Sequence, residues 1–128
     1  MGAKVAMTTL VVPDYASGIA FYRDVLGLRL VADTPLGGGK RWVVVEGDGG
    51  GRLLLAEASD EAQRAAIGRQ AGGRVGFFME TDDFARDYAA FSAGGAKFRE
   101  APRHEAYGTV AVFEDPFGNA WDLIEPVR

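Results

Sequence analysis

The sequence predicts an α+β fold of two tandem βαβββ modules that form a cup-shaped partial barrel. One observation is that short apolar, β-branched segments are separated by glycine-rich turns, which is typical of small sheets. Another is that each half contains a single amphipathic helix. The third is that the apolar positions of that helix recur 69 positions later. Tyr15, Ile19 and Tyr22 in the first half match Phe84, Tyr88 and Phe91 in the second. A repeat of this length indicates an internal duplication.

The first module spans about residues 1–58. Residues 4–12 are apolar and β-branched and predict a strand that ends at Pro13, because proline cannot donate a sheet hydrogen bond. Asp14 is placed to cap a helix that ends at Gly27. Three further strands are expected between glycine-rich turns, at residues 28–32, 41–46 and 53–58.

A polar, alanine-rich segment connects the halves and predicts a linker helix within residues 59–71. The second module, about residues 72–128, repeats the order of the first. Asp82 and Asp83 stand where a helix cap is expected, and Gly94-Gly95 ends that helix. The strands are expected at residues 74–80, 96–100, 109–114 and 120–125. The 128 residues are the length of a single domain.

A curved sheet with a helix on one face leaves its other face uncovered. Two such sheets together can close that face into a cup, which suits a small molecule. Alternation along the strands predicts which side chains share the inner face. They are Met7, Thr9 and Val11 in the first strand, Arg74, Gly76, Phe78 and Glu80 in the fifth, and Ala120, Asp122 and Ile124 in the last.

Composition excludes several kinds of chemistry. The chain has no cysteine and one histidine, His104, so thiolate catalysis, cysteine zinc sites and any site with two histidines from one chain are ruled out. The net charge of −4 and the lack of a basic stripe argue against a nucleic-acid partner. No apolar run approaches the ~20 residues of a spanning helix, and the N-terminus lacks a secretion signal. We therefore expect a cytoplasmic protein with no membrane partner.

Two motifs resemble those of the vicinal oxygen chelate superfamily, which includes glyoxalase I, extradiol dioxygenases, fosfomycin-resistance enzymes and bleomycin-resistance proteins. Residues 12–28 carry V-P-D-Y-x-x-x-I-A-F-Y-x-x-V-L-G-L, and residues 112–125 carry V-F-E-D-P-F-G-N-A-W-D-L-I-E. With the duplicated order of elements, the resemblance covers essentially the whole chain. It implies the glyoxalase/bleomycin-resistance/dioxygenase fold and a homodimer.

Enzymes of that superfamily usually bind one divalent metal through histidines of each first strand and glutamates of each last strand. Carried over residue by residue, the histidine positions fall on Met7 and Gly76. The carboxylate positions fall on Asp122 and on Ala56 or a neighbour, with Glu57 a ligand only if the register shifts. Oxygen ligands without an imidazole make a weak transition-metal site. We expect no cofactor, with a divalent metal at Asp122 and Glu57 as the alternative.

The remaining candidates have two interpretations each. Arg74 and Asp122 either grip an anionic ligand or form a structural ion pair, or Arg74 simply reaches solvent at the start of its strand. Glu80 and His104 are either catalytic bases or solvated side chains. Four aromatic residues either line a ligand site or pack in the core, namely Trp42, Phe78, Tyr107 and Trp121.

The function predicted from these residues is binding of a small molecule in the cup without a metal. The alternative is a lyase or dioxygenase of the same superfamily that uses the reduced carboxylate set. A third hypothesis is an enzyme without metal in which Glu80 or His104 is the base. The sequence identifies neither the ligand nor any pathway.

Overall fold

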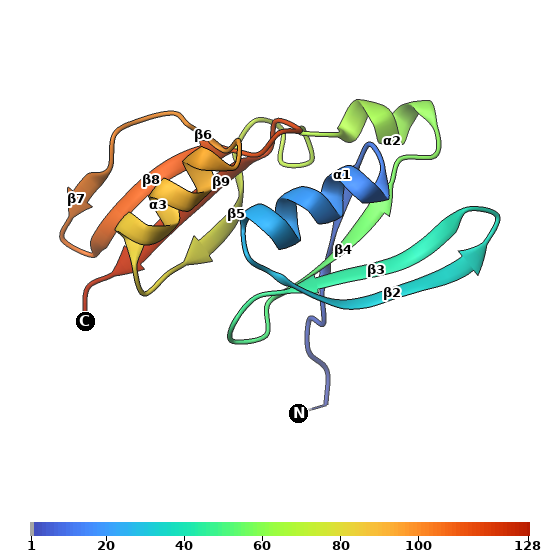
Figure 1. The fold of residues 1–128 in the computed structure, drawn as a ribbon, viewed down its shortest axis with the longest axis horizontal. Helices are drawn as coiled ribbons and strands as arrows, with labels where there is room; N and C mark the ends of the chain where they lie inside the picture. Colours follow the sequence, from blue (N-terminus) through green and yellow to red (C-terminus); the bar gives the residue numbers. More distant parts are fainter. Residues whose placement is uncertain (1) are drawn as a thin grey trace. The chain divides into compact units, whose positions relative to one another are not determined.

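The computed structural model describes residues 2–128 and contains two separate sheets, each with its own helix (Figure 1). The chain divides into two compact units, one extending to Ala66 and the other spanning Ile67–Arg128. The first unit has the order βαβββ before α2, and the second adds one short strand, β7, to the same order, so the predicted α+β fold of two βαβββ modules is confirmed.

The first unit has a four-stranded sheet in the order β1-β4-β3-β2. Strands β1 and β4 are parallel, and the other neighbours are antiparallel. Its elements are β1 (Thr8–Val12), α1 (Tyr15–Ile19), η1 (Ala20–Val25), β2 (Arg29–Gly37), β3 (Lys40–Glu46), β4 (Arg52–Glu57) and α2 (Glu61–Ala66).

The second unit has the equivalent order β5-β9-β8-β6, with the short strand β7 also paired to β8. Strand β5 runs parallel to β9, as β1 does to β4. The elements are β5 (Val75–Glu80), α3 (Phe84–Ala93), β6 (Lys97–Phe98), β7 (Arg103–Glu105), β8 (Gly108–Glu114) and β9 (Ala120–Pro126).

The element boundaries differ from the expected ones in several places, including β6, which covers only Lys97–Phe98, and β7, which was not expected. Strand β1 begins at Thr8 rather than residue 4, because only Thr8–Val12 has partners in β4. Strand β2 continues to Gly37, since its pairing with β3 tolerates two register shifts. The linker helix is confined to Glu61–Ala66, and the chain then turns through residues 67–73.

The first helix changes character halfway along. After α1 it continues as the π-helical η1, in which Leu26 N–H donates to the carbonyl of Phe21, five residues back.

Each helix covers one face of its own sheet. Gly18 of α1 lies against Val12 and Leu55, where an added Cβ would be 3.2–3.3 Å from their methyl groups. In the second unit the ring of Phe91 in α3 packs on Phe113 of β8 at 5.6 Å. The side chains under 2% exposed are Leu10, Val12, Tyr22, Val43, Val45, Leu55, Val110, Phe113 and Leu123.

The duplication extends to how the helices begin. Asp14 accepts from Ser17 N–H at 2.7 Å, and Asp83 accepts from Arg86 N–H at 3.1 Å, as N-caps do. A second carboxylate comes from the last strand of each module. Glu57 accepts from Tyr15 N–H at 3.2 Å, and Glu125 accepts from Phe84 N–H at 2.7 Å.

Within residues 2–128 no helix is long and apolar enough to cross a membrane.

Candidate functional site

The second sheet has one face beneath α3 and another that we call the open face, defined by Phe78, Glu80, Val112 and Asp122. Phe78 is the register partner of Asp122, which in turn is the partner of Val112. The neighbouring Trp121 points to the α3 side, where it stacks with Phe113 at 5.9 Å. Because side chains alternate along a strand, Asp122 lies on the open face.

Asp122 is the most unusual polar residue of this face. Its Oδ1 atom is buried and has no hydrogen-bond partner among the described residues. Burial raises the pKa of the Asp122 carboxyl above its ordinary value of 3.8, Arg103 opposes the shift, and Glu100 adds to it. Burying a carboxylate without a hydrogen-bond donor costs free energy. A proton, a hydrogen-bond donor or a cation at this position would lower that cost.

The cation that acts on Asp122 is Arg103, whereas the sequence suggested Arg74. Arg74 is exposed and precedes β5, and among the described residues it forms no ion pair with Asp122. Arg103 is itself held by Glu100 at 2.8 Å and approaches Glu105 at 3.5 Å. The carboxylate of Glu100 also accepts from Val112 N–H at 3.0 Å. Sequence periodicity did not predict this cluster, because its residues lie in β7 and in the segment between β6 and β7, both of which pair with β8.

Phe78 and Glu80 lie where alternation placed them. The Phe78 side chain is 71% exposed, which is high for an aromatic residue within a strand. Glu80 is exposed on the same face, two residues further along β5. Gly76 shares this exposed side of β5, although a register shift between Val75 and Phe77 interrupts the pairing there.

His104 belongs to a strand and not to the loop that the sequence suggested. It lies in β7 opposite Thr109, and its Nδ1 is 3.3 Å from the Thr109 hydroxyl. Tyr107 follows in the turn to β8, 52% exposed, and its carbonyl accepts from Val127 N–H at 3.0 Å. Both side chains are solvated.

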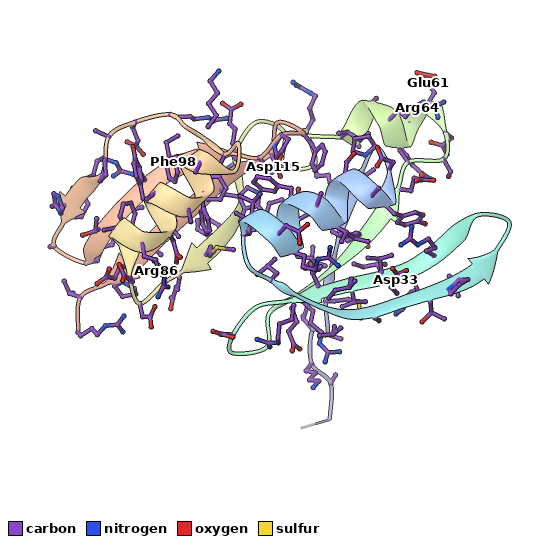
Figure 2. All side chains as sticks on the ribbon, viewed as in Figure 1. Asp33, Glu61, Arg64, Arg86, Phe98 and Asp115 are labelled. Atoms are coloured by element: carbon purple, nitrogen blue, oxygen red, sulfur yellow. The ribbon has the colours of Figure 1, made fainter. Side chains whose placement is uncertain are left out.

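Trp121 is a core residue. It is 3% exposed, stacks on Phe77 at 4.7 Å, and donates from Nε1 to Asp115 at 3.1 Å. Asp115 (Figure 2) also accepts from Phe117 N–H at 3.0 Å and from the backbone and side-chain N–H groups of Asn119 at 3.0 and 2.9 Å. The D-P-F-G-N motif is therefore a structural turn, and Trp121 is separated by the sheet from the open face.

The first module carries the other predicted residues. Thr9 is exposed in β1 and is the register partner of Leu54, while Met7 precedes β1 and is half-buried. Trp42 is 42% exposed in β3, opposite Thr34 of β2. These side chains share the sheet face opposite α1 by alternation.

The structure corrects the position that corresponds to Asp122 in the first module. Asp122 stands three residues before Glu125, and Leu54 stands three residues before Glu57, whose carboxylate makes the equivalent helix contact. The residue of the first module that corresponds to Asp122 is therefore Leu54. Counting along the sequence across the 47–51 turn suggested Ala56, two residues away. Glu57 points to the α1 side of its sheet.

These residues do not fit the divalent metal of the superfamily. The first-strand positions hold Met7 and Gly76, and the first-module carboxylate position holds Leu54, so Asp122 is the one hard donor left among the four. Glu57, the alternative ligand, accepts a helix N–H on the other face of its sheet. Within residues 2–128 no three His, Asp or Glu side chains are grouped closely enough to hold a metal.

Replacing Asp122 with asparagine is expected to stabilise the protein at neutral pH by about 1 kcal/mol, because the variant no longer buries a charge. The folded-state pKa of Asp122 lies above its unfolded value, so its ionisation destabilises the fold above the folded pKa. That penalty disappears as the pH falls through the folded pKa toward 3.8. Urea unfolding of both proteins from pH 7 to 4 measures the difference. A gap that widens toward acid pH would contradict this prediction.

Comparison with known proteins agrees with this architecture. The model of the Glyoxalase/Bleomycin resistance protein/Dioxygenase superfamily matches residues 4–123. An uncharacterised protein from Shewanella frigidimarina is 48% identical over 98% of this chain and 95% of its own length. Among solved structures, UcmS2 is 25% identical, with a TM-score of 0.80 over 98% of this chain and 99% of its own. TnmS3, an antibiotic binding protein from Streptomyces sp. CB03234, is 27% identical, with a TM-score of 0.75 over 99% of both chains. The chain belongs to the Glyoxalase/Bleomycin resistance protein/Dioxygenase superfamily, which confirms the resemblance to the vicinal oxygen chelate proteins.

Proposed function

We propose that this protein binds a small organic molecule on the open face of its second module, without the divalent metal of the superfamily. The observation that carries the proposal is the combination of an exposed Phe78 with the unpartnered Oδ1 of Asp122, its register partner. Leaving a phenyl ring in water is unfavourable, and a bound molecule would cover it, while the Asp122 carboxyl beside it supplies a partly desolvated negative charge. The similarity to TnmS3, an antibiotic binding protein, supports a binding role.

Metal-independence is part of the same proposal. Its support is the donor set, in which methionine, glycine and leucine occupy three of the four family positions. The lyase or dioxygenase alternative needs Glu57 as a ligand, and that carboxylate already caps α1. The exposed positions of His104 and Glu80 offer no observation that favours a metal-free enzyme.

The metal state is tested by mass spectrometry of the untagged protein after incubation with Zn²⁺, Mn²⁺, Ni²⁺ or Fe²⁺ and gel filtration. We expect substoichiometric metal in the wild type and no further loss in Asp122→Ala. One metal ion per chain that disappears in Asp122→Ala would overturn the metal-free proposal.

Binding is tested by equilibrium dialysis of the wild type against a mixed library of small organic compounds, read by mass spectrometry. Retained compounds are expected to be lost in Phe78→Ser and kept in Leu36→Ser, a control that removes an apolar side chain 53% exposed in the first module. If nothing is retained, or Phe78→Ser retains the same compounds, the proposed function is wrong.

We also propose that the protein is a homodimer, as the resemblance implies, and that it is cytoplasmic. A two-fold dimer is the commonest assembly of small soluble domains. Light scattering after gel filtration is expected to give twice the 13.7 kDa of one chain. A mass of one chain at micromolar concentration would contradict the dimer.

A further inference from the structure

The open face of the second module places an aromatic ring beside two carboxylates. Phe78 lies opposite Asp122 on the neighbouring parallel strand, and Glu80 is two residues along β5 on the same side. Neighbouring strands are about 4.8 Å apart, and alternate residues of one strand are about 6.6 Å apart. A ring stacked on Phe78 would therefore have both carboxylates within reach of its edge.

Positive charge compensates these two carboxylates only in part. Arg103, the guanidinium that acts on Asp122, is bound by Glu100 at 2.8 Å and approached by Glu105 at 3.5 Å. Glu80 forms no ion pair with any residue in the described part of the chain, and Asp122 Oδ1 has no hydrogen-bond partner there. The open face therefore carries both an aromatic ring and negative charge.

We infer that the ligand class of this face is a planar organic cation, stacked on Phe78 with its charged nitrogen toward Asp122 and Glu80. The inference rests on the proposed function and names the chemistry of its ligand. Cations gain both from an aromatic face and from a carboxylate in partly desolvated surroundings. An anionic ligand would meet two carboxylates and a guanidinium that is already paired, so charge complementarity selects the cation.

The test compares two fluorescent probes with the same three-ring frame, cationic 9-aminoacridine and anionic anthracene-9-carboxylate. Both are titrated with the full chain at pH 7 and low ionic strength, with EDTA present to exclude metal bridging. We expect the cation to bind at least about tenfold more tightly than the anion. Asp122→Asn is expected to weaken 9-aminoacridine about fivefold or more without weakening the anion, and Phe78→Ser to weaken both.

Glu61→Gln is the matched charge control. Glu61 lies in α2 of the first unit (Figure 2), with a side chain 93% exposed, so the variant removes one negative charge without altering any residue of the second module. It should bind 9-aminoacridine like the wild type. Thermal melting shows whether each variant is folded, and Asp122→Asn should be at least as stable as the wild type.

Three results in which a probe binds would overturn the inference. They are equal affinity for the two probes, unchanged cation binding in Asp122→Asn, and an equal loss in Glu61→Gln, which would indicate the net charge of the protein alone. Failure of both probes to bind would also overturn it. These failures differ from failure of the proposed function, which is measured by whether the dialysis library gives any Phe78-dependent ligand.

Discussion

Asp115→Ala is expected to lower the free energy of unfolding by about 3–4 kcal/mol, among the largest effects of any single substitution in this chain. The Asp115 side chain is 4% exposed, and its two oxygens accept hydrogen bonds from Phe117, Asn119 and Trp121. Alanine would leave those N–H groups buried without acceptors, which costs more than the bonds themselves contribute. Urea unfolding followed by tryptophan fluorescence measures the loss.

Asp82→Ala is the control for that experiment. Asp82 is in the same module, with a side chain 77% exposed, and pairs with Arg86 at 3.0 Å. Exposed pairs of this kind contribute about 0.5 kcal/mol. Similar losses in the two variants would show that the Asp115 hydrogen bonds do not hold the turn between β8 and β9.

Gly108→Ala is expected to destabilise the protein by about 3 kcal/mol. Gly108 begins β8 with φ of +153°, and an added Cβ would collide with the carbonyl oxygen of Glu125 and lie 3.0 Å from Cα of Pro126. Strand β8 is paired on both sides at this residue, with Glu105 and with Pro126, so the backbone has little freedom to move away. Thermal and urea unfolding measure the effect.

Gly72→Ala is the control for that variant, because it measures the cost of a positive φ without a steric collision of the added Cβ. Gly72 also has a positive φ, +64°, but an added Cβ in that turn would meet no heavy atom within 4 Å. Its cost should be about 1 kcal/mol, from conformation alone. If Gly108→Ala costs no more than Gly72→Ala, the close approach of β9 is not what requires glycine.

The motif that identifies the superfamily most clearly is thus a structural element. D-P-F-G-N fixes the turn between β8 and β9 through Asp115, and that turn sets the register in which Asp122 pairs with Val112. The residues that identify the family are therefore ones that hold the sheet together. The residues that select a ligand are different ones, exposed on the strands of that sheet. A shared fold with different open-face side chains gives different binding properties.

The two modules also show why counting along a sequence misplaces site residues. The 69-position repeat holds for the helices, but the carboxylates that cap them, Glu57 and Glu125, are 68 apart. A turn that is one residue shorter or longer accounts for the difference between 69 and 68 positions. A shift of one residue in a strand moves a side chain to the other face of the sheet. Glu57 was a possible metal ligand in the sequence and is a helix cap in the structure for this reason.

The sequence by itself determined the α+β class, the duplication, the helix caps at Asp14 and Asp83, and the absence of histidine at the family's metal positions. These depend on local chemistry and periodicity, which a single chain displays directly. Only the tertiary structure decided that Arg103 rather than Arg74 acts on Asp122, that Trp121 is buried against Phe77 and Phe113, and that Leu54 corresponds to Asp122. Those facts depend on strand register and on contacts between residues distant in sequence, and the energy that fixes them comes from packing across the sheet.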